Sequence, residues 1–132
     1  KSYSWSHQRV QRQQGRNWAT AIGDAVVKQR WRVENFPFDE QEMHIRLGYM
    51  NAKADRVIIV ADSAGSTYDL YNHEPGWHFK KFKVSAKPRV FASSFGEPGA
   101  TARQSAYARY DAMVVVQREG GTLFIKLFTG MY

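Results

Sequence analysis

Apolar and polar residues alternate most clearly in the middle of the chain. In residues 43–49 apolar side chains alternate with His, Arg and Gly, and this period of two predicts a half-buried strand. Residues 56–61 are a β-branched run, and together with residues 68–71 they predict a hairpin. Residues 77–84 and 89–92 are aromatic or β-branched, so they predict two further strands.

Helical spacing marks two other segments. Asn17 is an N-cap residue, and Trp18 and Ile22 begin an apolar series that predicts an amphipathic helix of about three turns ending near residue 29. Residues 101–104 fit the capping-box pattern and predict a short helix that continues through Tyr110.

Alternation returns elsewhere and completes the predicted fold. Residues 28–33 predict a strand that ends before Pro37, and the acidic residues 38–42 predict a turn. Residues 113–117, a Gly-Gly turn and residues 123–128 predict a C-terminal β-hairpin. The sequence therefore predicts an α+β fold, with a mostly antiparallel sheet of five to seven strands and two helices packed against it.

Composition adds a domain organisation to this pattern. The 132 residues are 43% hydrophobic, enough for a folded core, and the absence of cysteine excludes disulfides, thiolate zinc sites and a cysteine nucleophile. Residues 1–15 are rich in Gln and Ser, so they predict a basic flexible arm before a single α+β domain in residues 16–132. The arm's arginines are spaced to form a cationic helix on an anion; a solvated tail is the alternative.

The first residues bear on the origin of the chain. The sequence begins with Lys1 rather than with Met, and no apolar leader follows, so we expect a trimmed or excised product. No apolar run approaches the roughly 20 residues that span a bilayer. The sequence favours the cytoplasm, and a secreted or delivered domain stays open.

Net charge is the most informative bulk property. The chain carries a formal charge of +7, and residues 1–32 contain seven Lys or Arg against Asp24 alone. A second basic run without acids lies in residues 80–89. Positive fields of this kind attract phosphate backbones, so nucleic acid is the expected partner. We expect phosphate contacts and base stacking from Arg9, Arg12, Arg16, Lys28, Arg30, Arg32, Trp77, Lys80, Lys81, Phe82, Lys83, Lys87 and Arg89.

A small metal-independent nuclease is the alternative hypothesis. RNA cleavage needs a general base, a general acid and a cation for the phosphorane. His44 and Arg46 should share one strand face, and His73 and His78 flank basic segments, so these four residues are the catalytic candidates. Incidental surface histidines explain the same pattern.

Other chemistry finds little support in the sequence. The spacing of His73 and His78, interrupted by Pro75 and Gly76, does not fit the zincin helix, and no phosphate-binding or dinucleotide-binding glycine loop is present. We therefore expect no metal and no cofactor. A protein-interaction or inhibitor domain that binds an acidic partner is a further alternative, and membrane-surface binding ranks last because the basic segments lack a broad apolar face.

Overall fold

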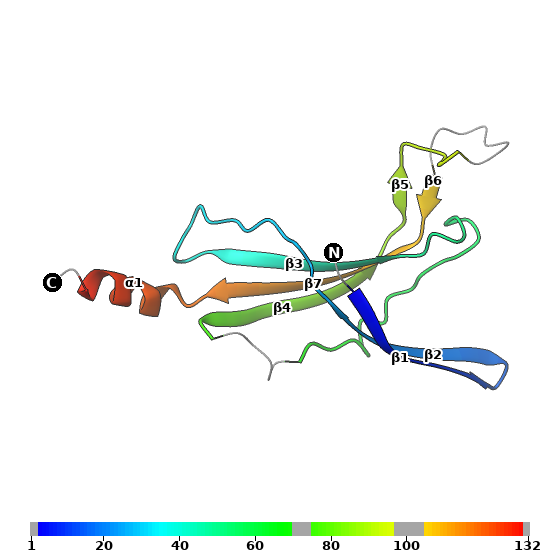
Figure 1. Cartoon of the computed structure of the whole chain (residues 1–132), viewed down its shortest axis with the longest axis horizontal. Helices are drawn as coiled ribbons and strands as arrows, with labels where there is room; N and C mark the ends of the chain where they lie inside the picture. Colours follow the sequence, from blue (N-terminus) through cyan, green and yellow to red (C-terminus); the bar gives the residue numbers. More distant parts are fainter. Residues whose placement is uncertain (1–2, 70–74, 97–104, 131–132) are drawn as a thin grey trace. The chain divides into compact units, whose positions relative to one another are not determined.

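The computed structural model describes residues 3–69, 75–96 and 105–130, and this part of the chain is mostly antiparallel strand (Figure 1). It divides into two units, one within residues 1–30 and one within residues 31–132. The elements are β1 (Tyr3–Gln13), β2 (Arg16–Ala25), β3 (Glu40–Gly48), β4 (Trp77–Ala86), β5 (Arg89–Phe91), β6 (Ser105–Tyr107), β7 (Arg109–Arg118) and α1 (Gly120–Thr129).

The first unit is the antiparallel hairpin of β1 and β2. Gln14 and Gly15 connect the strands with φ angles of 49° and 74°. Positive φ at both central residues is the mark of a type I′ turn, whose twist matches that of the flanking strands. Residues pair without interruption from Gln13 with Arg16 to His7 with Ile22, and the register then shifts by skipping Ser6.

This hairpin corrects the helix predicted after Asn17, because residues 18–25 of that segment lie in β2. Most of the residues of the predicted arm lie in β1. Trp18 and Ile22 are four residues apart, a spacing that fits one face of a strand as well as one face of a helix. The turn at Gln14 and Gly15 lies before this series and favours strand pairing over helix formation.

The second unit is built on a three-stranded sheet in the order β3-β7-β4, and β5 and β6 form a separate two-stranded sheet. The strands predicted in residues 43–49, 77–84, 89–92 and 113–117 are confirmed by β3, β4, β5 and β7. The buried apolar residues lie in or next to this sheet and are Val84, Ala108, Val115 and Val116.

The predicted C-terminal hairpin is wrong, because α1 follows β7. Both edges of β7 are already paired, one with β3 and one with β4, so a returning strand has no free edge on β7. Gly120 is buried where the chain approaches the Pro37 carbonyl and the Phe38 ring, and a Cβ at Gly120 would collide with both. The first glycine of the pair therefore serves close packing.

Four further predictions for the rest of the chain differ from the structure. Residues 56–61 form no strand, and Ile58 and Val60 are exposed, so the hairpin predicted there is wrong up to residue 69. The predicted second helix falls partly on residues 101–104, outside the described residues, and its remainder lies in β6 and β7. Residues 28–33 are not a strand, and the predicted acidic turn is wrong because β3 begins at Glu40.

The described residues thus form mostly antiparallel sheet with a single short helix, in agreement with the α+β class. The predicted single sheet of five to seven strands with two helices does not match, because the largest described sheet has three strands. In the second unit, α1 follows one end of that sheet and β5 and β6 lie beyond the opposite end (Figure 1). None of the helical structure in the described range is long and apolar enough to cross a bilayer.

Candidate nucleic-acid interface

The sheet β3-β7-β4 has a charged face and an apolar face. Side chains alternate between the two faces along each strand, and residues paired across strands share a face. The rows that cross the sheet on one side are Glu40–Gln117–His78, Glu42–Val115–Lys81, His44–Met113–Lys83 and Arg46–Asp111–Ser85. We call this side the charged face.

A β-bulge at Lys80 keeps the aromatic side chains of β4 away from the charged face. The register with β7 skips Lys80, because Phe79 pairs with Val116 and Lys81 with Val115. In a regular strand Phe79 and Phe82 would point to opposite faces, since they are three residues apart. The extra residue places both rings on the apolar face and leaves Lys81 on the charged face.

The apolar face is covered by other aromatic side chains. Tyr68 stacks on Phe79 with ring centroids 5.1 Å apart and lies 6.3 Å from Phe82. Trp31 packs on Trp77 at 5.3 Å. Trp77 and Phe82, the two rings predicted to stack on bases, therefore pack within the protein on the side opposite Lys81 and Lys83.

A buried ion pair anchors one end of the apolar face. Arg118 donates two hydrogen bonds to the Asp39 carboxylate, at 2.7 and 3.3 Å, and its guanidinium lies 4.2 Å from the Trp77 ring centroid. The hydrogen bond from Arg118 is the main cause of the lowered pKa of Asp39, and it outweighs the opposing effect of burial. The Asp39 side chain is only 2% exposed and that of Arg118 is 24% exposed, so the carboxylate is buried and the guanidinium is partly buried.

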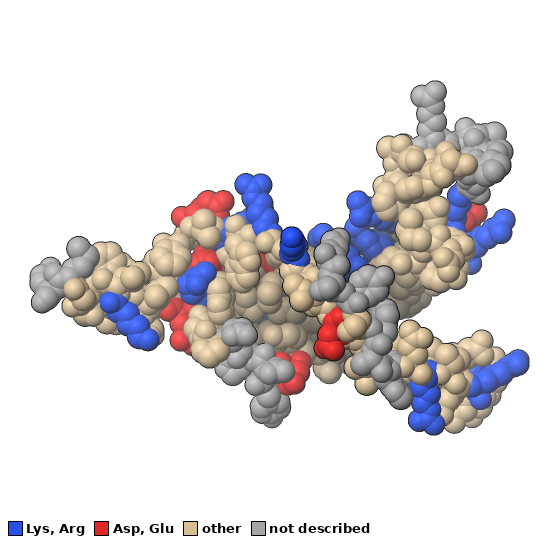
Figure 2. All heavy atoms as spheres, in the orientation of Figure 1, with Lys and Arg blue, Asp and Glu red and all other residues tan. Residues whose placement is uncertain are grey.

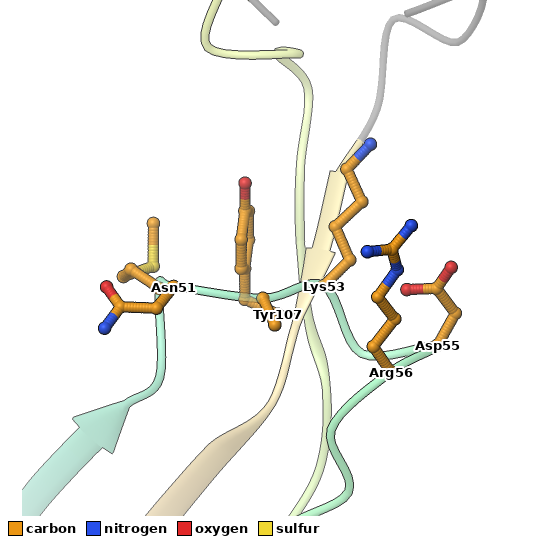
Figure 3. A pocket seen from close by; sticks show the side chains of 7 residues that line it. Asn51, Lys53, Asp55, Arg56 and Tyr107 are labelled. Atoms are coloured by element: carbon orange, nitrogen blue, oxygen red, sulfur yellow. The ribbon is translucent and has the colours of Figure 1, made fainter.

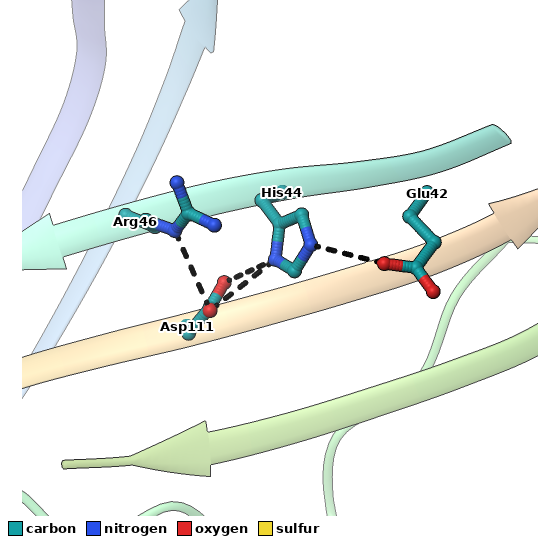
Figure 4. Close-up of polar contacts among 4 residues, drawn as sticks. All are labelled: Glu42, His44, Arg46 and Asp111. Atoms are coloured by element: carbon teal, nitrogen blue, oxygen red, sulfur yellow. Dashed lines mark hydrogen bonds and ion pairs between the residues drawn. The ribbon is translucent and has the colours of Figure 1, made fainter. Parts of the chain in front are cut away.

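The charged face holds a cluster of polar side chains on β3 and β7 (Figure 4). The Nδ1 atom of His44 lies 3.0 and 3.2 Å from the two carboxylate oxygens of Asp111. The Nε atom of Arg46 is 3.5 Å from Asp111, and Nε2 of His44 is 3.8 Å from Glu42. The predicted pair of His44 and Arg46 is thus brought together by a carboxylate from the neighbouring strand.

Asp111 is charged in this cluster. Burial raises the pKa of Asp111. The hydrogen bond from His44 and the charges of His44 and Arg46 together lower this pKa by more, so the net shift is downward. A carboxylate at Nδ1 fixes the orientation of the imidazole and directs Nε2 away from Asp111. This arrangement of an imidazole oriented by a carboxylate is one that general-base catalysis uses.

Of the other two predicted histidines, only His78 lies within the described residues, and it is not part of this cluster. His73 lies outside the described residues. His78 is in β4, in the row of Gln117, about 13 Å along the strand from the row of His44, and its Nε2 is 3.2 Å from Glu119. Among the histidines of the described residues, His44 is therefore the one that contacts Asp111.

The predicted lysines and arginines are distributed over several surfaces. Lys80, Lys81, Lys83, Lys87 and Arg89 are all exposed on or after β4. The Arg89 guanidinium lies 4.6 Å from the centroid of the Phe91 ring. Figure 2 shows Lys and Arg atoms gathered beside β5 and β6, whereas most of the Asp and Glu atoms seen in the second unit lie toward the end of the sheet that leads to α1.

The N-terminal cations occupy a different surface. Arg9, Arg12 and Arg16 are exposed in the β1–β2 hairpin, and Lys28 and Arg30 are exposed after β2. In the second unit the backbone of Arg32 exchanges two hydrogen bonds with the side-chain amide of Gln41, at 3.0 and 2.5 Å. That side-chain contact takes the place of the strand pairing predicted for residues 28–33.

Sequence reasoning missed several polar residues of the second unit. Asp111 is the main omission. An acid on one strand that faces a His-x-Arg pair on another strand is the signal for it, but this signal can be recognised only when the register between the two strands is known. Arg109 is the second, with an Nε atom buried and lacking a hydrogen-bond partner among the described residues. Sequence reasoning also missed a pocket of about 260 Å³, which Lys53, Arg56 and Tyr107 help to line (Figure 3).

Neither a metal-binding arrangement among the described residues nor a similar protein assigns a role to these surfaces. Over the described residues, no group of three or more His, Asp or Glu side chains is arranged to hold a metal ion. Comparison of the chain with protein-family models, with curated proteins and with solved structures finds no match.

Proposed function

We propose that this protein binds nucleic acid, with the charged face of the β3-β7-β4 sheet contacting the phosphates. The observation that carries the proposal is the placement of Lys81 and Lys83. Both are exposed on one strand face, and the aromatic side chains of the same strand lie on the other. Arg46 adds a cation on β3, on the other side of β7 and in the row next to that of Lys83.

The charges of this face are mixed along the strands. Glu42 at the start of β3 lies in the same row as Lys81, and Asp111 lies in the row of Arg46. Lys83 has no acid in its own row, so it is the cation of this face best placed to attract a phosphate.

A salt titration tests this proposal. A fluorescently labelled 20-nucleotide strand and a 20-base-pair duplex, both of mixed sequence, are titrated with the protein at several salt concentrations. Each phosphate contact adds about 0.9 to the slope of log K against log salt on duplex DNA, and about 0.7 on a single strand. We expect Lys81→Gln/Lys83→Gln to lower the slope by about 1.8 in total on duplex DNA.

The matched control is Arg56→Gln/Lys126→Gln, which removes two exposed charges outside the charged face. We expect this variant to change the slope by less than half as much as Lys81→Gln/Lys83→Gln. Absence of binding at low salt, or equal slopes for the two double variants, would contradict the proposal.

The contact of His44 with Asp111 favours a second candidate function, cleavage of RNA on the same face. In this mechanism Nε2 of His44 accepts the proton of a 2′-hydroxyl, and the 2′-oxygen then attacks the adjacent phosphorus. The bond from phosphorus to the 5′-oxygen breaks, and the 5′-oxygen takes a proton from water. Lys83 lies in the same row as His44, beyond Met113, where its charge stabilises the phosphorane.

Incubation with RNA in EDTA tests the cleavage hypothesis. We expect products that end in a 2′,3′-cyclic phosphate, no cleavage of a DNA strand of the same sequence, and loss of cleavage in His44→Ala. Asp111→Asn should reduce the rate by about 100-fold or more, because the amide no longer holds the reacting tautomer. Unchanged cleavage in His44→Ala would remove the charged face from the reaction and leave the binding proposal intact.

A further inference from the structure

The tip of the β1–β2 hairpin has an unusual composition for an exposed two-stranded element. Among residues 8–17, eight carry the planar amide or guanidinium groups of Gln, Asn and Arg, and none is acidic. Asp24 is the sole acid of the hairpin and lies at its other end, paired with Ser4. Every residue from Gln8 to Asn17 is exposed.

These side chains match the chemistry of base edges in duplex DNA. Arg donates two hydrogen bonds to the O6 and N7 atoms of guanine, and Gln or Asn bonds to the N6 and N7 atoms of adenine. The major groove of B-form DNA admits a two-stranded β-ribbon. The hairpin, with 10 or 11 residues in each strand, has that form.

The two faces of the hairpin differ in bulk. One face carries Gln8, Val10 and Arg12 on β1, paired with Ala21, Ala19 and Asn17 on β2. The other carries Arg9 and Gln11 paired with Thr20 and Trp18, and the Trp18 side chain is 65% exposed. Small residues allow the backbone to approach base edges closely, and Ala or Val contacts the methyl group of thymine.

We infer that the β1–β2 hairpin is a ribbon that enters the major groove of duplex DNA and reads bases through Gln8, Arg12 and Asn17. The inference rests on the proposed nucleic-acid binding and names the duplex form of that partner. A-form RNA is unsuited, because its major groove is deep and too narrow for side-chain readout. The alanine face turns toward the groove floor, since the Trp18 ring on the other face would hold the backbone away.

Selection of duplexes from a random library tests the readout. The full chain is mixed with DNA duplexes that contain a randomised 16-base-pair core, bound molecules are recovered and amplified over several rounds, and the enriched sequences are read. We expect a short preferred sequence that contains guanine and adenine. Equilibrium titration of the preferred duplex, of single-base variants and of the duplex RNA of the same sequence then measures the preferences.

Two double variants separate base reading from charge. Arg12→Thr/Asn17→Thr alters the alanine face, and Arg9→Thr/Gln11→Thr alters the tryptophan face. Each removes one arginine and one amide side chain, and threonine is compatible with a strand. We expect the first to reduce discrimination between the preferred duplex and single-base variants by about 10-fold or more, and the second to preserve discrimination while weakening binding uniformly.

The possible results divide cleanly. Enrichment of a sequence that depends on Arg12 and Asn17 supports the ribbon, and so does weaker binding of duplex RNA. A chain that binds nucleic acid but enriches no sequence, that discriminates equally well in both double variants, or that prefers RNA or single strands overturns the ribbon and leaves the proposed function standing. Failure of the proposed function has a different signature, namely no binding of any nucleic acid at low salt.

Discussion

The β1–β2 hairpin and the β3-β7-β4 sheet use the same antiparallel pairing with opposite results. The sheet has a central strand paired on both edges, and it buries Val84, Val115 and Val116. The hairpin has two strands of similar length, yet every one of its side chains with a described environment is exposed. A third strand and a covering layer, rather than ladder hydrogen bonds, are what create a core.

Polar residues differ between the two regions in the same way. In the second unit, the Asp39 carboxylate accepts a hydrogen bond from Arg118, and the Asp111 carboxylate contacts the His44 ring at 3.0 Å. Near the hairpin turn, Gln and Arg side chains are exposed on both faces. The polar groups of the second unit are therefore engaged within the protein, whereas those near the hairpin turn are exposed to solvent.

The largest expected effect comes from removing the buried carboxylate of the sheet. Asp39→Ala leaves the partly buried Arg118 guanidinium without its partner, and we expect a loss of about 3 kcal/mol in the free energy of unfolding. Urea unfolding followed by circular dichroism measures it. Glu42→Ala, at an exposed carboxylate, is the control and should change stability by less than about 0.5 kcal/mol. Equal losses in the two variants would contradict the structural role of Asp39.

The same substitution in both regions measures the difference between them directly. Val84 is 6% exposed in the sheet and Val10 is 74% exposed in the hairpin. We expect Val84→Ala to cost about 2 kcal/mol, because two methyl groups leave a packed core, and Val10→Ala to cost less than about 1 kcal/mol. Urea unfolding gives both values. A larger loss at Val10 would mean that the hairpin is covered by another surface.

The sequence predicted the sheet better than its surroundings. Strict alternation located most of β3, β4 and β7, and His44 and Arg46 were correctly expected on one strand face. Alternation carries this information because a strand with one buried face has a period of two. The bulge at Lys80, the partner Asp111 and the apolar placement of Trp77 depend on the register between strands, which residues far apart in the chain determine.

The wrong elements have identifiable physical causes. The Gly-Gly pair before α1 resembles a hairpin turn, but pairing on both edges of β7 leaves no place for a returning strand. The apolar series after Asn17 fits two periods at once, and the turn at Gly15 decides between them. In both cases the deciding information lies outside the segment being interpreted.

Acid should weaken the sheet through its two carboxylates. The pKa values of Asp39 and Asp111 are lowered in the folded protein, so these groups contribute stability above the unfolded value of about 3.9. That contribution is lost as the pH falls through the folded values. We expect urea midpoints to fall steeply below about pH 4, and Asp39→Asn/Asp111→Asn to flatten that fall. An identical pH profile in the double variant would contradict the assignment.

The smallest expected effect tests whether the two regions unfold separately. Gly15 has a φ of 74°, and Gly15→Val forces a β-branched residue into that conformation at a cost of about 1 kcal/mol. Amide hydrogen exchange in the hairpin should then quicken by about 5-fold, while exchange in β7 stays unchanged because β7 belongs to the other unit. Gln14→Asn should slow hairpin exchange, since Asn-Gly is the preferred pair for this turn. Equal acceleration of exchange in β7 would show that the hairpin and the sheet open as one cooperative structure. The two regions would then differ in the exposure of their side chains but not in their stability.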